Sequence, residues 1–131
     1  MVVTGLLLVG HGSKKPYNKE LIEKTAKMMS EKSGDYLIKS AFMSINEPCI
    51  EEVLEQFRNE EIDRLVVVPL FLADGVHISE DIPRILGLAS GEKKGVFGRS
   101  SGDIPLYYAD PIGNNPMLAD LMLESARNAI E

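Results

Sequence analysis

The chain contains two histidines, His11 and His77, and each of them lies after an apolar stretch of sequence. His11 stands in the segment GHGS at residues 10–13, which ends the apolar run of residues 6–9. The apolar run of residues 64–72 precedes His77 in a similar way. Neutral imidazole is a good ligand for Co²⁺, Ni²⁺, Zn²⁺ and Fe²⁺. The two side chains therefore predict a metal site, provided that the fold brings them together.

Short apolar runs alternate along the chain with segments of helical periodicity. An apolar run without polar alternation is typical of a strand that is buried on both faces. The predicted strands cover roughly residues 6–9, 36–43, 64–72 and 105–109. The predicted helices cover residues 16–32, a segment from Asn46, a segment from Ser79, and residues 116–130, and residues 91–103 are expected to form an exposed, mobile loop.

Strands that alternate with helices indicate right-handed βαβ units and a parallel sheet with helices on both faces. We therefore predict an α/β fold of three layers: a doubly wound, flavodoxin-like sheet of four parallel strands in the order 2-1-3-4, with residues 1–131 as a single domain. The last helix is expected to pack on the sheet through apolar residues that recur at helical spacing: Leu118, Leu121, Met122 and Ala126.

The predicted strand order places the first and third strands side by side. Their carboxyl ends flank the crevice in which open sheets of this type bind ligands. His11 leaves the end of the first strand, and His77 leaves the end of the third. The topology therefore predicts that the two imidazoles converge.

A carboxylate is expected on the same rim of the sheet. Glu47 follows the second strand, in the segment Asn46-Glu47-Pro48, which we expect to open a helix with Asn46 as its cap. Two imidazoles and one carboxylate leave coordination positions open, which suits a metal that is handed on. Two other interpretations stay open: a non-catalytic carrier of a divalent metal, and a small flavodoxin-like binding module in which both histidines are incidental.

Other kinds of catalytic site find little support in the sequence. The segment at residues 10–13 is similar to the phosphoenzyme histidine of the RHG phosphatases, but Gly10 stands where those enzymes need an arginine. No P-loop, G-x-S-x-G or G-x-G-x-x-G pattern occurs. Cys49 is more simply a small buried residue than a reactive thiol.

Composition narrows the class of protein further. The chain has 131 residues, 44% of them hydrophobic and 26% charged, and a net charge of −6. The negative charge argues against binding to nucleic acid. A single cysteine excludes an internal disulfide, and no apolar stretch approaches the ~20 residues that span a bilayer. We expect a cytoplasmic protein without a membrane partner or a signal peptide.

Four segments carry a resemblance to a known family. They are LLLVGHGS at residues 6–13, INEPCIEEVL at 45–54, VVVPLFLADGVHISEDIP at 66–83 and ADPIGNNPML at 109–118. In these segments the chain resembles the small, single-domain sirohydrochlorin cobaltochelatases. They are class II chelatases, which insert a divalent metal into a tetrapyrrole without nucleotide. The resemblance runs from the first strand to the last helix.

The resemblance implies an enzyme of cobalamin biosynthesis that takes Co²⁺ as a substrate and carries no prosthetic group. By resemblance, His11 and His77 are the metal ligands and insertion residues, and Glu47 matches an acidic residue that binds metal or accepts protons. Because larger members have two such domains, the resemblance implies a homodimer here. Insertion of iron or nickel into the same tetrapyrrole is the alternative, because imidazole does not select cobalt by affinity.

Sirohydrochlorin carries eight carboxylates, so a protein of net negative charge needs cations and donors around the cleft. The residues expected to bind it are Gly10, Ser13, Lys14, Glu47, Gly75, Val76 and Arg84. Further candidates are Lys15, Lys93, Lys94 and Arg99, together with helix N-termini near Ser13, Ser79 and Asn115.

Overall fold

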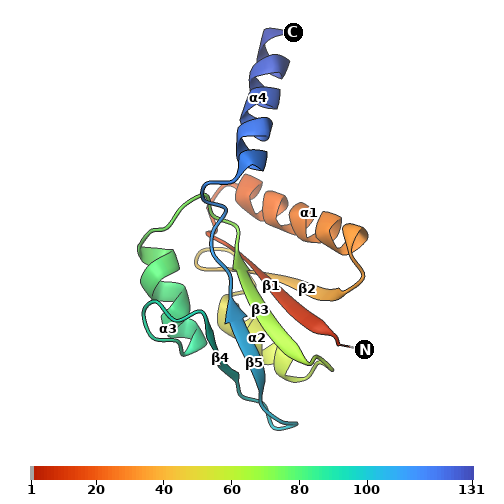
Figure 1. Ribbon diagram of the computed structural model, residues 1–131, viewed down its shortest axis with the longest axis vertical. Helices are drawn as coiled ribbons and strands as arrows, with labels where there is room; N and C mark the ends of the chain where they lie inside the picture. The colour runs from red at the N-terminus through yellow and green to blue at the C-terminus, as the bar shows by residue number, and fades with distance from the viewer. Residues whose placement is uncertain (1) are drawn as a thin grey trace.

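The computed structural model describes residues 2–131 and contains a five-stranded sheet with helices on both of its faces (Figure 1). The strands are β1 (Thr4–Gly10), β2 (Tyr36–Phe42), β3 (Arg64–Pro69), β4 (Lys94–Phe97) and β5 (Ile104–Tyr108). The helices are α1 (Pro16–Lys32), α2 (Ile50–Arg58), the π-helical turn η1 (His77–Asp81), α3 (Ile82–Leu86) and α4 (Pro116–Ile130). None of these helices is both long enough and apolar enough to cross a membrane.

The strand order is β2-β1-β3-β5-β4. β1 pairs in parallel with β2 on one side and with β3 on the other, and β3 pairs in parallel with β5. The four parallel strands therefore have the predicted order 2-1-3-4, with β5 as the fourth. This confirms the doubly wound α/β architecture.

Two apolar layers hold helices against the sheet. On one face, Ile22 of α1 is fully buried against Leu6, Leu8 and Phe42. On the other face, the core includes Phe57 of α2 and several other residues of α2, η1 and α3: Ile50, Val53, Leu54, Ile78 and Ile82. The alternation of β1 side chains between the two layers explains why all seven of its residues are buried.

The fifth strand corrects the prediction of four strands and of an exposed loop over residues 91–103. β4 lies in that segment and pairs antiparallel with β5 at the edge of the sheet. Phe97 is buried, and the guanidinium of Arg58 lies 4.8 Å from the centre of its ring. The strand has only four residues, one of them Gly95, and is flanked by charged residues and glycines. Such a short segment shows no clear alternation of polar and apolar residues, so the sequence does not predict a strand there.

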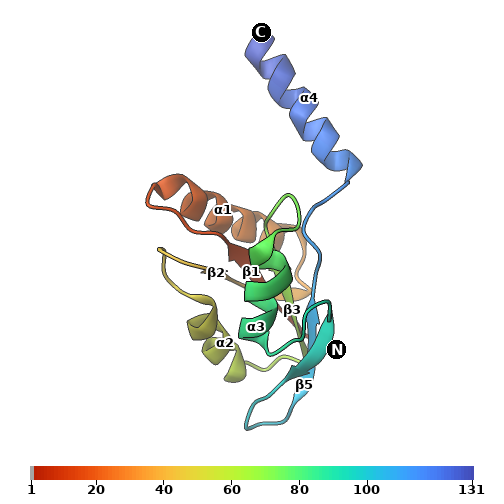
Figure 2. The same cartoon turned by 90° about the vertical axis from the view of Figure 1, so that its left-hand side faces the viewer.

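α4 does not pack on the sheet as predicted. Its first residues follow the predicted cap, because the Asn115 side chain accepts a hydrogen bond from the Met117 backbone N–H. However, none of its residues is buried, and Leu121 and Met122 are 55% and 58% exposed. Figures 1 and 2 both show α4 projecting away from the rest of the chain. The α1 face of the sheet is therefore covered by α1 alone.

Two helices begin at other residues than predicted. α2 begins at Ile50 with Cys49 as its N-cap, because the backbone N–H of Phe42 bonds to the carbonyl of Pro48 and holds residues 43–48 as a loop. The third helical segment begins at His77, two residues before the predicted start at Ser79. His77 is therefore a helical residue, and this determines what its side chain can reach.

Candidate metal site at the carboxyl edge of the sheet

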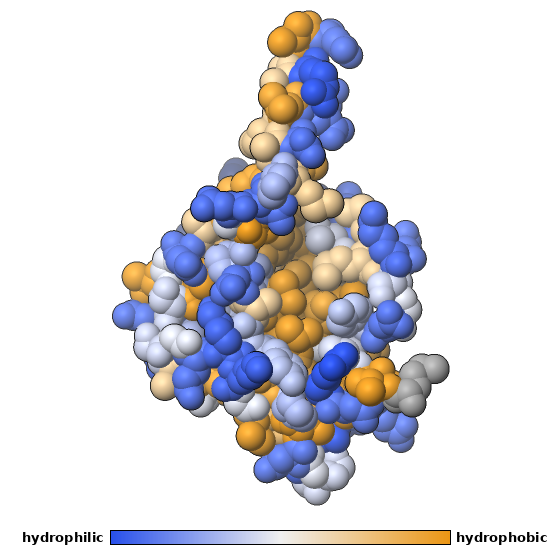
Figure 3. Space-filling model, viewed as in Figure 1, coloured by the Kyte–Doolittle hydropathy of each residue, from blue (hydrophilic) through white to orange (hydrophobic). Residues whose placement is uncertain are grey.

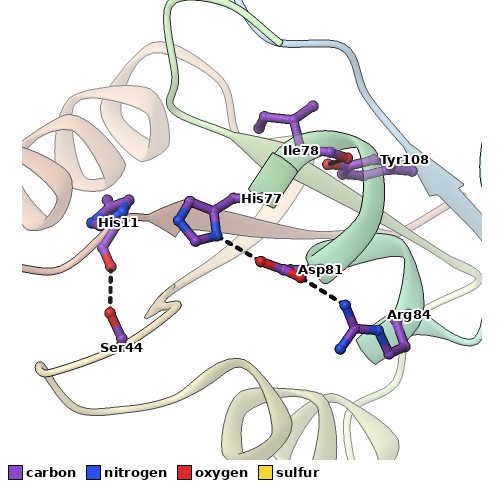
Figure 4. A network of polar contacts seen from close by, with 7 residues as sticks. All are labelled: His11, Ser44, His77, Ile78, Asp81, Arg84 and Tyr108. Atoms are coloured by element: carbon purple, nitrogen blue, oxygen red, sulfur yellow. Dashed lines mark hydrogen bonds and ion pairs between the residues drawn. The ribbon is translucent and has the colours of Figure 1, made fainter. Parts of the chain in front are cut away.

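The structure brings His11 and His77 together at the carboxyl edge of the sheet (Figure 4). β1 and β3 run side by side up to the pair Val9 and Pro69, so the loops that follow them start at the same edge. The ring centres of the two histidines are 4.9 Å apart, and the rings meet at 72°. Both side chains are exposed, so the site opens to solvent.

Each imidazole uses its Nδ1 atom in a hydrogen bond within the protein. His11 Nδ1 lies 3.1 Å from the carbonyl oxygen of Gly12, and His77 Nδ1 lies 2.7 Å from Oδ2 of Asp81. Both partners are acceptors, so each neutral ring donates through Nδ1–H and keeps its lone pair on Nε2. Within residues 2–131 neither Nε2 has a hydrogen-bond partner. Both rings therefore present a nitrogen suited to a metal ion.

The spacing of the rings suits one shared ion. A metal–imidazole bond of about 2.1 Å puts the ring centre about 3.2 Å from the ion, so two rings on one tetrahedral ion have centres about 5 Å apart. The observed separation is 4.9 Å. In the part of the chain that the structure describes, no group of three or more His, Cys, Asp or Glu side chains could hold a metal. Two imidazoles alone leave most coordination positions open.

The π-helical turn places Asp81 beneath His77. The backbone N–H of Ile82 bonds to the carbonyl of His77, five residues earlier, and Asp81 lies four residues after His77 on the same side. Oδ1 of Asp81 accepts a second hydrogen bond, at 2.7 Å, from Arg84. The hydrogen bond from His77, together with the charge of Arg84, lowers the pKa of the Asp81 carboxyl. Asp81 therefore stays ionised and orients the His77 ring (Figure 4).

Tyr108 holds the same turn in place through a hydrogen bond. Its hydroxyl donates a buried hydrogen bond of 2.8 Å to the carbonyl of Ile78, the residue after His77. Burial, followed by the negative charges of Asp74 and Asp110, raises the pKa of Tyr108 to about 12. The phenol therefore stays protonated and keeps donating to the turn that carries His77.

Glycine 12 and two asparagines hold the loop that carries His11. The Gly12 N–H donates to Asn18 Oδ1 of α1 at 2.9 Å, and the Ser13 N–H donates to Asn46 Oδ1 at 2.8 Å. Gly12 has a φ of +92°, and a Cβ at this position would lie 1.9 Å from the carbonyl oxygen of Ser44. Only glycine fits this position, so the loops after β1 and β2 depend on it to pack against each other.

The other residues predicted for the site have various positions. Glu47 is exposed in the loop after β2, on the same edge of the sheet. Lys14, Gly75 and Val76 are exposed in the loops next to the two histidines. Ser13 is half-buried, and its hydroxyl accepts a hydrogen bond from the Lys15 N–H.

Several of the predicted groups have partners inside the protein. Gly10 is buried, and a Cβ there would lie 2.5 Å from Ile22, so it serves the packing of α1. Arg84 pairs with Asp81, and Lys93 pairs with Asp110 at 3.0 Å. Arg99 bonds to the carbonyl of Glu60, in the loop before β3, and therefore lies at the opposite, amino edge of the sheet.

Three residues near the histidines were not singled out from the sequence. Asp81 was missed because the helix was expected to begin after His77; a helix from residue 77 would have placed the two at i and i+4. Phe71, whose ring centre lies 6.0 Å from that of His11, was interpreted as an apolar residue of the third predicted strand. Tyr108 joins the site across a sequence separation of 30 residues, and no local pattern signals such a contact.

Comparisons with known proteins point to a single family. The family model described as CbiX matches residues 5–129. A sirohydrochlorin cobaltochelatase of Methanococcoides burtonii is 41% identical over 122 residues, which cover 93% of each chain. One of Methanosarcina acetivorans is 40% identical over 127 residues and 96% of each chain.

Solved structures agree in fold. The CbiX protein of Marinobacter aquaeolei superposes with a TM-score of 0.68 and 25% identity over 97% of both chains. The sirohydrochlorin chelatase SirB of Bacillus subtilis subspecies spizizenii, solved with cobalt, gives a TM-score of 0.80 over 97% of this chain. The present chain covers 51% of that SirB chain, and at 22% identity the likeness concerns the fold.

Replacing Gly12 by alanine should destabilise the protein. The alanine must adopt a positive φ, which costs about 1–2 kcal/mol, and its Cβ meets the Ser44 carbonyl. Urea unfolding followed by circular dichroism measures the effect. Gly34→Ala is the matched control, because a Cβ there meets nothing within 4 Å. Equal stability of the two variants would contradict the packing described here.

Replacing Asp81 by asparagine should weaken Co²⁺ binding by about 10- to 100-fold, since the carboxylate that orients the candidate ligand His77 is replaced by a neutral amide, which can also donate to Nδ1 and change the tautomer of the ring. Isothermal titration measures the affinity, and ¹⁵N NMR of the His77 ring reports which nitrogen carries the proton. Glu80→Gln removes a neighbouring carboxylate that has no such hydrogen bond and should leave both readouts unchanged. Unaltered affinity in Asp81→Asn would show that Asp81 does not orient His77.

Replacing Tyr108 by phenylalanine should cost about 1 kcal/mol, because the Ile78 carbonyl loses its donor. The cost should depend on pH. The folded protein holds the phenol proton up to about pH 12, whereas an unfolded tyrosine releases it near pH 10. The contribution is complete below pH 10 and is lost as the pH rises towards 12. In urea unfolding, the advantage of the wild type over Tyr108→Phe should shrink from pH 9 to pH 11; a constant difference would refute this account.

Proposed function

Because the chain belongs to the CbiX family, we propose that it is a sirohydrochlorin cobaltochelatase, which inserts Co²⁺ into sirohydrochlorin without nucleotide. The choice of cobalt follows the names of the relatives from Methanococcoides and Methanosarcina. Co²⁺ is a substrate in this proposal, and the protein needs no prosthetic group. We place the reaction in the cytoplasm.

The observation that carries the proposal is the pair of imidazoles at the carboxyl edge. Their ring centres are 4.9 Å apart, and both Nδ1 atoms are engaged inside the protein. An ion held by His11 and His77 through Nε2 keeps positions for water and, in exchange, for pyrrole nitrogens. Weak, incomplete coordination of this kind suits an ion that has to leave the protein for the macrocycle.

The two histidines donate hydrogen bonds to different kinds of acceptor, and this suggests an order in which they release the metal ion. His77 donates to a carboxylate, which makes its ring the stronger electron donor, whereas His11 donates to a neutral carbonyl. We assign to His77 the longer hold on the ion and to His11 the earlier release. Each Co–N bond to the ring system replaces one bond to water or to an imidazole.

Metal insertion also releases two N–H protons from the macrocycle. Glu47 is our candidate acceptor, because it is exposed on the same edge of the sheet and no hydrogen bond within residues 2–131 engages its carboxylate. Within residues 2–131 Glu47 forms no three-residue metal-binding group with the two histidines, which favours proton acceptance over metal ligation. His77 is the second candidate once the ion has left it.

We assign positive groups on both sides of the site to the substrate's carboxylates. Lys14 and Lys15 are exposed between His11 and the first turn of α1. The amino end of α1 adds a partial positive charge and backbone donors. We assign these groups, with Arg84 on the other side of His77, to the binding of the macrocycle's edge. The net charge of −6 makes such local cations necessary.

A homodimer completes the proposal. The side chain of His77 is 47% exposed, so one copy of the chain offers a single open wall to a flat macrocycle. A second copy facing the site would provide the other wall, exclude water and hold a bent ring, which favours the transition state of insertion.

The test mixes protein, sirohydrochlorin and Co²⁺ and follows the visible spectrum of the tetrapyrrole. The wild type should accelerate the spectral change, and His11→Ala and His77→Ala should each abolish the acceleration. Glu47→Gln should slow turnover while Co²⁺ binding is retained. Lys32→Ala, at the far end of α1, serves as a control with full rate.

The outcomes separate the alternatives. Binding of Co²⁺ without any spectral acceleration would indicate a metal carrier. Full rate in both histidine variants would refute the site. A faster reaction with Fe²⁺ or Ni²⁺ than with Co²⁺, at equal free metal, would replace cobalt by that metal in the proposal.

A further inference from the structure

One residue at the carboxyl edge of the sheet has a backbone conformation that its side chain disfavours. Within residues 2–131, Ile45 is the only residue other than glycine with a positive φ, at 69°. Glycine and asparagine adopt such angles readily, whereas a β-branched side chain is strained there. Strain of this kind persists only where the surrounding structure enforces it, and it is typical of functional sites.

The strain at Ile45 comes from a tight turn of three residues. The Asn46 N–H donates to the carbonyl of Ser44, two residues earlier, at 2.7 Å. With a positive φ at its centre, this is the rare and strained form of the γ-turn. Two further turns, at residues 60–62 and 113–115, are closed by bonds of the same kind, but their central residues have no positive φ. The strained form is therefore particular to the turn after β2.

Contacts with the loop that carries His11 hold this turn in place. Before Ile45, the hydroxyl of Ser44 donates to the carbonyl of His11 at 3.5 Å (Figure 4). After Ile45, Oδ1 of Asn46 accepts a hydrogen bond from the Ser13 N–H at 2.8 Å. The two residues beside Ile45 are thus bonded to the two residues on either side of the glycine in the His11 loop. The turn and the loop of the candidate metal ligand form one unit.

These contacts explain the turn but not the isoleucine. Ile45 is 62% exposed, so it contributes little to the apolar core. Exposed apolar side chains alone are common, and Figure 3 shows several of them on α4 and in the middle of the face below it. Ile45 differs from these because its backbone is strained without burial in compensation. A glycine would form the same turn without the strain, so we look for the role of Ile45 in its side chain.

Other exposed aliphatic residues lie in a neighbouring loop. Leu72 and Val76 are 61% and 65% exposed in the loop after β3, and Val76 directly precedes His77. The strand order β2-β1-β3 places the loops of Ile45 and Val76 on either side of the loop that carries His11. The candidate metal site therefore has exposed aliphatic residues on both of its flanks.

We propose that the side chain of Ile45 contacts the apolar face of the tetrapyrrole. This inference rests on the function proposed above. A tetrapyrrole is apolar on its faces and carries its carboxylates at its edge, so the lysines near His11 suit the edge and an aliphatic side chain suits a face. The closed turn and the stiff β-branched side chain have little freedom to lose when the substrate binds. The strained turn thus holds the apolar group in one position before the substrate arrives.

Ile45→Gly should affect stability and substrate binding differently, because it removes both the strain and the side chain. Val96→Gly is the matched control, since Val96 is β-branched and 65% exposed but has an ordinary strand backbone in β4. Both glycines add freedom to the unfolded chain, and only the one at position 45 also relieves strain. In urea, the unfolding midpoint of Ile45→Gly should rise, or fall by less than that of Val96→Gly. An equal or larger fall would overturn the proposal.

The insertion assay with sirohydrochlorin and Co²⁺ measures the contact itself. Ile45→Gly should raise the KM for sirohydrochlorin about 10-fold, which corresponds to the loss of most of one buried isoleucine side chain. Ile45→Leu keeps an aliphatic side chain and should recover most of this loss, whereas Val96→Gly should keep the KM of the wild type. Isothermal titration of Ile45→Gly with Co²⁺ alone should give the affinity of the wild type.

The outcomes separate this proposal from the function on which it rests. An active wild type with an unchanged KM in Ile45→Gly would overturn the contact and leave the proposed function intact. Weaker Co²⁺ binding in Ile45→Gly would show that the residue serves the His11 loop, and it would also overturn the contact. A wild type that neither binds nor converts sirohydrochlorin would refute the function and the contact together.

Discussion

The parallel pairing of β1 with β3 is the interaction on which the candidate site depends. Its register runs without interruption from Thr4 opposite Arg64 to Val9 opposite Pro69. A shift by one residue would turn the side chains of one strand to the wrong layers, so burial on both faces holds this register. Because the pair is held to its end, the two loops that follow carry their histidines to one place. The geometry of the candidate metal site is thus a consequence of packing in the sheet, away from the site itself.

Beyond the ends of the strands, hydrogen bonds rather than buried apolar side chains hold the loops in place. The His11 loop is tied to α1 and to the loop after β2 by Asn18 and Asn46. The π-helical turn is tied from below by the hydroxyl of Tyr108 and carries its own carboxylate, Asp81. Both rings are thereby oriented by one nitrogen and left open at the other. The candidate site combines oriented imidazoles with exposure to solvent, an arrangement that suits the binding and release of an ion.

The parts of this architecture that follow from local pattern were predictable from the sequence. The buried apolar run of β1, the helical periodicity of α1 and the alternation of elements specify the strand order, and the strand order brings His11 and His77 to one edge. Contacts over long sequence separations were not predictable in this way, and Tyr108 with Ile78 is an example. Asp81 was not identified because the helix that carries it was predicted to begin two residues too late. β4 was not predicted because a strand of four residues that includes a glycine shows almost no alternation of polar and apolar residues.

α4 shows another limit of structure prediction from the sequence of a single chain. Its periodicity correctly predicted a helix and its apolar face, because both are local properties. The partner of that face is not a local property, and amphipathicity does not say whether the covering surface belongs to the same molecule. The segment before α4 is held by backbone hydrogen bonds from Ile112 and Gly113 to the carbonyls of Phe71 and Leu72, and these form only when β3 and β5 are paired.

The two borders of the sheet have a further consequence for self-association. On β2, Lys39 lies over the ring of Phe57 and pairs with Glu60, so a charged side chain points inward along that outer strand. At the other border, β4 is short and contains Lys94 and Gly95. Short and charged outer strands resist the addition of foreign strands. The addition of further strands, and with it the growth of fibrils, is therefore disfavoured at both borders of the sheet.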